Sequence, residues 1–573
     1  MNTKTISVVI YLLLFFTYHS GFAFDKSGID FAIWTGASTA GNSWEDPENW
    51  DTFAVPTSFD DITIPATDND PFISAATLAE VDDLTIEAGA KLTLGFDPFT
   101  NGGSGASLKV HGNLVNDGVI DMLSSASLVL LGTRTGSGST LMSRSLTGSE
   151  TLYIMGMPLE GITIGDLGAD FVYTYNNTTQ LYEVPSSSTV MQPGKGYFVG
   201  SRASTFFFFN RDRTDNTIAY GNIDVDVTDN TDGFNLIANP YPTAIDVAAF
   251  FTNTNNSTVT TGTAYLWNDG GTNSGALRGG DYVTVNSMGT ATGRFDPGTG
   301  VAGLKDPNRF DGAFNSFQGF FVEANQNGVV SFTPDMQVTG DNDTNSFFRE
   351  TQESDDQRSI LKLSLRGNNH YNEVIIGQDH QATFDDDYSM DAKKLTGNGR
   401  MSFYAIHDET QYSILAIPFV ERGRVDLGFD LSDVGEYELS VEELSMAENS
   451  TSYFLIDHLT GERIELRNDA VLNFTLKQGF DNRRFSVEIS GKPNNTLESQ
   501  LNPRLGIEKV NDLLMLNHRG NSERVLISDL QGRVLFDQVV DFSYGQSIVD
   551  ASLREGEIYL LQVGSYRSKF VWD

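Results

Sequence analysis

Residues 525–535 read VLISDLQGRVL, two short apolar runs joined by the turn residues 529–532. Short apolar runs bounded by turn residues are typical of β-strands. Similar runs punctuated by turn residues lie at 513–516, 548–553, 558–563 and 569–571. The region 501–573 is therefore predicted to form a small, self-contained antiparallel β unit.

The order of these runs resembles the type A sorting domain found at the C-terminus of type IX secretion cargo in Bacteroidota. The residues that carry the resemblance are Asn502, Pro503, Asp529, Leu530, Gly532, Arg533, Gly556, Tyr559 and Lys569. Gly556 precedes Tyr559 by three residues where the family usually has two, and the chain ends in Trp572-Asp573 rather than in a basic residue. The alternative is an unrelated small β-sandwich at the end of a secreted protein.

The resemblance implies an export route and a set of partners. These are the type IX translocon and its processing machinery, which would cut in the linker at 491–500, and surface lipopolysaccharide as an attachment point. The sequence leaves open whether the terminal unit is removed. The implied location is outside the cell or on the outer face of the outer membrane.

The N-terminal residues have the pattern of a secretory signal peptide, predicted to span 1–23. Lys4 precedes an apolar core at 6–16, and small residues near Ala23 indicate cleavage between Ala23 and Phe24. The core is shorter than the ~20 residues that a bilayer-spanning helix needs. No comparable run follows, so we expect no transmembrane segment in the mature chain.

Composition narrows the range of partners and chemistries. The 573 residues include no cysteine, which excludes disulfides, thiol catalysis and thiolate metal sites. The formal net charge of −39 disfavours binding to nucleic acid or to anionic lipid. With 55 glycines and no long helical periodicity, the chain is predicted to be an all-β protein of several domains.

The region 24–150 contains a weak repeat of period-two strands. They lie at 84–86, 92–94, 108–110 and 128–130, separated by glycine- and asparagine-containing turns. This spacing suits a solenoid in which each turn buries one face on the next. We predict a short parallel β-helix or a related β-roll. The opening motifs around Trp34, Trp44 and Trp50 resemble the front of large Bacteroidota surface proteins.

The region 151–340 contains a longer repeat, which predicts two related β modules. Residues 153–158 recur as 234–240, residues 173–176 as 265–268, and residues 194–199 as 317–322. Each copy is predicted to close with an apolar strand, at 206–209 and at 329–332. The aromatic run at 206–209 would be an aggregation hazard if exposed, so we expect it to be buried.

The remaining segments complete the predicted organisation. Residues 341–357 are acidic and without pattern, which indicates a linker. Residues 358–490 contain short strands at the cadence of a β-sandwich, and residues 491–500 form a second linker before the terminal unit at 501–573.

No metal or cofactor site is predicted. Residues 341–345 begin like an EF-hand calcium loop, but Ser346 replaces the required glycine and Gln352 the bidentate glutamate. Calcium binding therefore has no specific motif behind it. Other acidic residues could offer oxygens, although solvated loops and strand faces explain them equally well; these are Asp224, Asp226, Asp229, Asp385, Asp386 and Asp387.

Catalytic motifs are absent from the sequence, and we predict that the chain is not an enzyme. It contains no His-Glu-x-x-His and no Gly-x-Ser-x-Gly motif. A pair of carboxyl groups for glycoside hydrolysis cannot be selected among 76 acidic residues. Trp34, Trp44, Trp50 and Trp267 could form a platform for sugar rings, but core packing is the stronger expectation.

The predicted function is that of a non-enzymatic secreted or surface-attached protein with an adhesive or structural role. The alternative is an extracellular protein that binds or degrades polysaccharide. Glycans and other surface proteins are the candidate ligands, and a spacer without any ligand is a third hypothesis.

Overall fold

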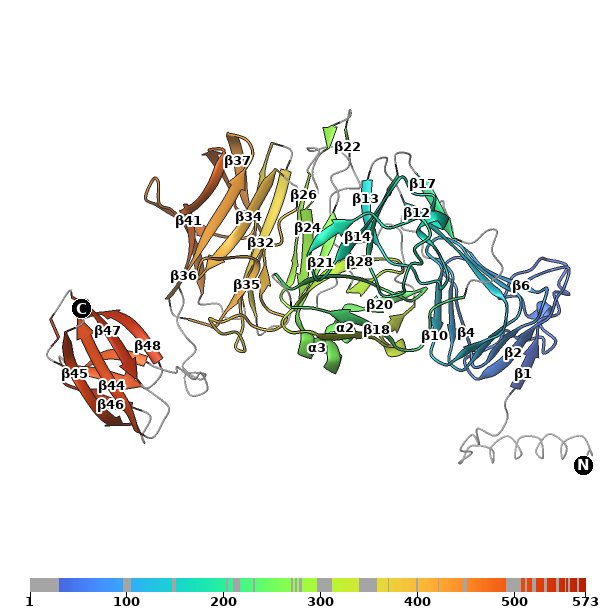
Figure 1. The fold of residues 1–573 in the computed structure, drawn as a ribbon, viewed down its shortest axis with the longest axis horizontal. Helices are drawn as coiled ribbons and strands as arrows, with labels where there is room; N and C mark the ends of the chain where they lie inside the picture. The colour runs from blue at the N-terminus through green and yellow to red at the C-terminus, as the bar shows by residue number, and fades with distance from the viewer. Residues whose placement is uncertain are drawn as a thin grey trace, which may run out of the picture. The chain divides into compact units, whose positions relative to one another are not determined.

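Figure 1 shows the computed structural model, in which the chain divides into two compact units, Met1–Gly491 and Lys492–Asp573. In the first unit the structure describes residues 30–95, 105–146, 151–201, 205–209, 217–229, 232–268, 272–273, 276–277, 281–295, 312–339, 358–368, 370–397, 400–420, 422–446 and 451–490. In the second it describes residues 506–510, 513–517, 522–529, 533–542, 546–551, 553–554, 557–563 and 566–572.

The N-terminal part of the first unit is a parallel β-helix with three faces. A parallel β-helix was one of the two folds predicted for this region, the other being a β-roll. One face is ordered β1-β2-β5-β8-β11, the second β10-β7-β4, and the third β12-β9-β6-β3 with β17 added at its end. The strands are β1 (Asp30–Ile33), β2 (Asp60–Ile64), β3 (Phe72–Ile73), β4 (Leu78–Val81), β5 (Leu84–Ile86), β6 (Lys91–Leu94), β7 (Ser107–Val110), β8 (Leu114–Asn116), β9 (Val119–Met122), β10 (Ser127–Leu130), β11 (Arg134–Thr135) and β12 (Ser139–Leu146).

Period-two alternation explains why these short segments stack. The side chains of Ile62, Leu84 and Leu114 lie at matching positions of three successive turns and are buried. The next residue along each of these strands is only partly buried. Each turn therefore covers the apolar face of its neighbour, which no turn could bury alone.

The aromatic run at 206–209 forms a strand, but it does not close the module that precedes it. β17 (Thr205–Phe209) pairs antiparallel with β12 and so becomes the last strand of one β-helix face. A β-helix leaves the edge of its final turn unpaired, and β17 satisfies that edge with backbone hydrogen bonds. The expected burial of its side chains lies outside the described residues.

The two predicted modules are confirmed, and they share one strand topology. The first sheet is ordered β13-β16-β14-β15 and the second β19-β28-β21-β24-β25. The strands are β13 (Thr151–Met155), β14 (Phe171–Asn176), β15 (Leu181–Glu183), β16 (Tyr197–Ser201), β19 (Phe234–Ala238), β21 (Thr260–Asn268), β24 (Asp281–Asn286), β25 (Gly289–Ala291) and β28 (Gly319–Ala324).

The register agrees with the sequence repeat residue by residue. In the first sheet, Ile154 and Tyr173 both pair with Phe198. In the second, Leu236 and Tyr265 both pair with Phe321. These are the positions that the repeat equates.

The two modules pack against each other about a local two-fold axis. An isolated bridge joins Met155 to Gln318, and the equivalent bridge joins Ile237 to Lys195. Between them a shared cluster of apolar and aromatic side chains fills the interface; its buried members are Ile154, Tyr175, Phe198, Leu236, Tyr265, Tyr282 and Phe321. The chain thus packs one copy of a module against the other through the same surface, as in an isologous dimer.

Smaller elements complete the second module. They are β18 (Ile223–Val227), β20 (Ala244–Asp246), α2 (Val247–Thr252), α3 (Thr254–Val259), β22 (Thr272–Asn273), β23 (Ala276–Leu277), β27 (Ala313–Phe314), β29 (Gly328–Phe332), the 3-10 helix η3 (Pro334–Met336) and β30 (Gln337–Val338). The short strand β26 (Gly293–Phe295) pairs instead with residues 370–372 of the sandwich sheet. Two further 3-10 helices, η1 (Pro47–Asn49) and η2 (Ile164–Leu167), precede the second module. Asp246 caps α2 by accepting a hydrogen bond from the Ala249 amide.

Residues 358–490 form one long sheet that curls around a single core. Its main path is β39-β38-β41-β36-β34-β35-β32-β31-β37-β40. The strands are β31 (Ser359–Gly367), β32 (His370–Gln378), β33 (Ala392–Lys393), β34 (Met401–His407), β35 (Thr410–Ile417), β36 (Arg422–Leu431), β37 (Gly435–Ser445), β38 (Ser452–Asp457), β39 (Glu462–Leu466), β40 (Val471–Leu476) and β41 (Gly479–Ser490).

The two ends of this sheet face each other, as the layers of a β-sandwich do. Phe474 of β40 packs against Phe485 of β41, with ring centroids 4.8 Å apart, although the two strands lie near opposite ends of the path. β32 is buried along its whole length because it is covered on both faces. One face lies on the sandwich core, and the other packs on Met288 and Ala291 of the second module.

The second unit is a two-sheet β fold with its own core, as expected for the terminal region. One sheet is ordered β42-β43-β46 and the other β45-β44-β47-β48. The strands are β42 (Gly506–Val510), β43 (Leu513–Asn517), β44 (Ser522–Asp529), β45 (Val534–Asp541), β46 (Gln546–Val549), β47 (Ile558–Val563) and β48 (Tyr566–Val571). All-β architecture in several parts is therefore confirmed. Among the described residues, no helix has the length and apolarity to cross a bilayer.

Candidate functional site

The turn that carries the sorting-domain resemblance is held by one carboxylate. Asp529 ends β44, and its Oδ1 accepts a hydrogen bond of 2.9 Å from the backbone amide of Arg533. Its Oδ2 accepts a second one of 3.0 Å from the Arg533 Nε, and the Asp529 amide donates to the Arg533 carbonyl. The Asp529 side chain is 12% exposed and that of Arg533 72%, so the carboxylate anchors the turn while the guanidinium faces solvent.

Tyr559 is the second resemblance residue that the structure places in detail. It is buried in the core of the terminal unit, and its hydroxyl donates to Glu557 Oε2 and accepts from the Arg554 amide. Lys569 lies in β48, and its side chain is not described. The other predicted positions lie outside the described residues; these are Ala23, Phe24, Asn502, Pro503, Leu530, Gly532 and Gly556.

The four tryptophans considered as a platform for sugar rings instead pack in the hydrophobic cores. Trp34, Trp44 and Trp50 are fully buried at the first turn of the β-helix. Trp50 packs edge-on against both others, with ring centroids 5.1 Å from Trp34 and 4.8 Å from Trp44. Trp267 packs against Phe198 between the two modules. The expected core packing is confirmed.

An acidic cleft of about 310 Å³ opens between the second module and the sandwich. Lys393 lies 2.7 Å from Glu323 Oε1 and 3.7 Å from Asp386 Oδ2, and the Tyr412 hydroxyl donates to Asp386 Oδ1. Burial raises the pKa of Glu323 in spite of Lys393, because Glu323 is almost completely covered. Burial would lower the pKa of the half-exposed Lys393, but its hydrogen bond to Glu323 prevails and raises it.

Asp391 lies at the floor of this acidic cleft and ties two segments together. Its Oδ1 accepts from the Ala416 amide of β35, and its Oδ2 accepts from the Asp387 amide. Burial raises the pKa of Asp391 to about 7. The two hydrogen bonds act to lower this pKa, and the negative charges of Asp387 and Asp386 act to raise it. These contacts join the loop at 383–391 to the sandwich.

Three of the six acidic residues considered as metal ligands are engaged in other contacts. Asp386 binds Tyr412 and Lys393, Asp387 accepts from the Thr383 amide, and Asp224 accepts from the Ser331 hydroxyl. Within the described ranges, no three histidine or acidic side chains converge in a metal-binding arrangement. The calcium-like run at 341–345 lies outside those ranges.

A second cleft, which we call the Arg484 cleft, lies at one end of the sandwich and has a volume of about 450 Å³. Its lining includes His458, Leu459, Lys477, Phe480, Arg483 and Arg484. Two hairpin turns bound it, one between β38 and β39 and the other between β40 and β41. No sequence motif pointed to it.

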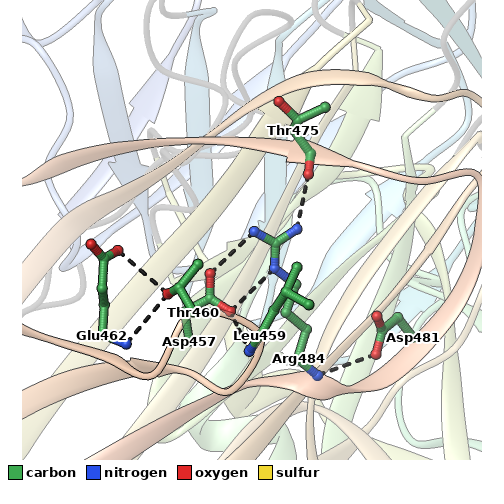
Figure 2. A network of polar contacts seen from close by, with 7 residues as sticks. All are labelled: Asp457, Leu459, Thr460, Glu462, Thr475, Asp481 and Arg484. Carbon is green, nitrogen blue, oxygen red and sulfur yellow. Dashed lines mark hydrogen bonds and ion pairs between the residues drawn. The ribbon is translucent and has the colours of Figure 1, made fainter.

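Arg484 forms the wall of the Arg484 cleft and is fixed in place (Figure 2). Its Nε and one terminal nitrogen donate to the two oxygens of Asp457 at 3.3 and 3.1 Å, and the other terminal nitrogen donates to the Thr475 carbonyl at 2.8 Å. Asp457 is 1% exposed. Burial would raise the pKa of Asp457, but hydrogen bonds from Arg484 and the Leu459 amide prevail and lower it.

A β-bulge in β41 places the arginines. Leu427 pairs with Phe485, and Phe429 pairs with Asp481. A step of two residues along β36 therefore corresponds to a step of four residues along β41. Gly428 lies opposite the extra residues, and a Cβ there would come within 2.2 Å of the Asn482 side-chain oxygen. A larger residue at this position would require neighbouring side chains to move, and the bulge redirects the side chains that follow it.

Comparison with known proteins gives one informative match. None of the curated proteins matches the chain. A solved structure described as "Biofilm associated protein - BSP domain" covers 76% of this chain and 96% of its own at 6% identity, with a TM-score of 0.11, which is too low to indicate a common fold. A family model described as "Domain of unknown function (DUF8693)" matches residues 33–489, from the first strand of the β-helix to the end of the sandwich. The chain therefore belongs to the DUF8693 family.

Proposed function

We propose that this chain is a secreted, surface-displayed β scaffold with an adhesive or structural role, exported by the type IX secretion system through its terminal unit. The observation that supports this most directly is that residues 506–572 close around their own core. The family match ends at residue 489, before this unit. An export signal that is read as a folded domain needs such independence from its cargo.

The proposed role is non-enzymatic. The most buried carboxylates at the two clefts join strands and loops: Asp391 holds the loop at 383–391 on β35, and Asp457 holds Arg484. Repeated modules and a solenoid supply a large, rigid surface, which suits attachment to other surfaces.

The export proposal is tested in a Bacteroidota host with a functional type IX system. The full chain, a chain that lacks residues 501–573, and a reporter fused to residues 492–573 are compared on cells and in culture fluid. We expect the full chain and the reporter outside, and the truncated chain retained. Undiminished export of the truncated chain would contradict the proposal, and mass mapping of the mature C-terminus shows whether the unit is removed.

The adhesive role is tested separately. A strain that lacks the protein is expected to attach less to surfaces and to neighbouring cells than its parent, and the full chain should restore attachment. Attachment equal to that of the parent would contradict an adhesive role while leaving the export proposal intact.

A further inference from the structure

The Arg484 cleft is basic in a strongly acidic protein. The chain carries 76 acidic and 37 basic residues other than histidine, yet this cleft contains Lys477, Arg483, Arg484 and His458 around a single lining carboxylate, Asp481. Asp481 Oδ1 accepts from the backbone amides of Arg483 and Arg484, so it serves the bulge. A concave surface with a surplus of one sign of charge attracts ligands of the opposite sign.

Two of these cations are available to a ligand. Arg484 is satisfied by Asp457 and Thr475, but Lys477 and Arg483 are exposed, and neither forms an ion pair with any residue that the structure describes. Two exposed arginines elsewhere on this sheet differ in this respect, because Arg424 binds Asp426 and Arg463 binds Glu488.

The side chains at the base of the Arg484 cleft are held in place by other parts of the sandwich. The buried Asp457–Arg484 pair fixes the wall, and the backbone amides of Arg483 and Arg484 are held by the Asp481 carboxylate within the bulge of β41. Bulges are frequent beside functional sites because they redirect side chains. A site held in this way loses little conformational entropy when a ligand binds.

The remaining lining suits a ring that bears hydroxyl groups. Phe480 is 61% exposed and Leu459 74%, so both offer apolar surface, and Gln478 in the same lining carries an amide with both a donor and an acceptor. The volume of about 450 Å³ is within the range of small-ligand sites.

We propose that the Arg484 cleft binds an acidic glycan, a sugar chain that carries carboxylate or sulfate groups. Lys477 and Arg483 bind the anionic group, and one face of the sugar ring packs on Phe480. A mixture of unpaired cations, one exposed aromatic ring and neutral polar groups favours a charged sugar over an acidic peptide, which would offer no hydroxylated ring. The site is independent of the export route, since it lies within residues 429–484 of the sandwich.

The test uses the purified full chain from which only residues 1–23 are missing. Binding of oligogalacturonate, sulfated dextran oligomers, neutral dextran oligomers and poly-glutamate peptide is measured by calorimetry. We expect binding to one or both charged glycans, none to neutral dextran, and weakening as salt rises. The double variant Lys477→Gln/Arg483→Gln should bind about tenfold more weakly, because two exposed charge contacts are lost.

The matched control is Arg424→Gln/Arg463→Gln, which removes the same charge from the same sheet outside the cleft and should bind as the parent does. Phe480→Ala should weaken glycan binding, with an unchanged thermal midpoint to show that the fold is intact. Absence of binding to both charged glycans, equal binding by the two double variants, or binding to poly-glutamate as tight as to the glycans would overturn the proposal.

Discussion

Gly156 and Ala238 occupy equivalent positions of the two modules and lie against each other at the local two-fold axis. The Gly156 amide donates to the Phe317 carbonyl at 2.8 Å, and the Ala238 amide donates to the equivalent carbonyl, that of Gly194, at 2.9 Å. A Cβ on Gly156 would lie 2.3 Å from the Cβ of Ala238. The axis thus has room for one methyl group, and the two copies must differ there.

Substitution Gly156→Ala should therefore destabilise the first unit. A second methyl group at the axis forces the modules apart, and overpacking of this kind costs about 1–3 kcal/mol. Calorimetric unfolding of the whole chain should show a lower midpoint. Gly435→Ala is the control, because a Cβ there meets only the end of the Asn368 side chain at 3.2 Å. Equal midpoints for both variants would contradict the axis packing.

The repeat and most strands were readable from the sequence because they follow local patterns. The period-two runs at 92–94 and 128–130 fall within β6 and β10. The equivalence of 194–199 and 317–322 predicted two related modules, and the two sheets of these modules share one pairing register.

What the sequence did not predict depends on contacts between distant segments. Gly428 lies inside β36, where a side chain would meet those of Asn482, Tyr404 and Ile406. Arg484 meets Asp457 because β38 pairs with β41, with Asp457 opposite Phe485. The aromatic run 206–209 was expected to close its own module, yet it pairs with β12 because the last turn of the β-helix has an open edge.

The Asp457–Arg484 pair should contribute measurably to stability. Asp457→Asn leaves the guanidinium without its carboxylate, which should cost about 2–3 kcal/mol. The pKa of Asp457 lies below its ordinary value of 3.8 in the folded chain. Its contribution is therefore complete at neutral pH and is lost as the pH falls below about 4, through the folded pKa.

The measurement is the unfolding midpoint at pH 7 and at pH 3. Parent and Asp457→Asn should differ at pH 7, and the difference should be smaller at pH 3. Asp469→Asn, an exposed aspartate of the same sheet region, should match the parent at both values. A difference that persists unchanged at pH 3 would show that the charge of Asp457 is not what stabilises the pair.

Asp391 should give the opposite dependence on pH. Its folded pKa of about 7 lies above its ordinary value of 3.8, so the folded chain holds a proton that the unfolded chain releases. This group therefore disfavours folding progressively as the pH rises from about 4 through 7. In Asp391→Asn, the fall in unfolding midpoint between pH 5 and pH 8 should be smaller than in the parent. Asp385→Asn, in the same loop, should retain the parental fall, and an identical fall in all three would contradict the assignment.

In the terminal unit, Asp529→Ala should loosen the fold far more than Asp537→Ala. Asp529 is nearly buried and supports both the amide and the side chain of Arg533, so its loss leaves a turn without its anchor, at a cost of about 1–2 kcal/mol. Asp537 pairs with Arg524 at 2.7 Å, but both side chains are solvent-exposed, and exposed pairs contribute little. Limited proteolysis of the full chain should cleave within 506–572 faster in Asp529→Ala, and at the parental rate in Asp537→Ala. If both variants were cleaved alike, burial of the carboxylate would not be what orders the turn.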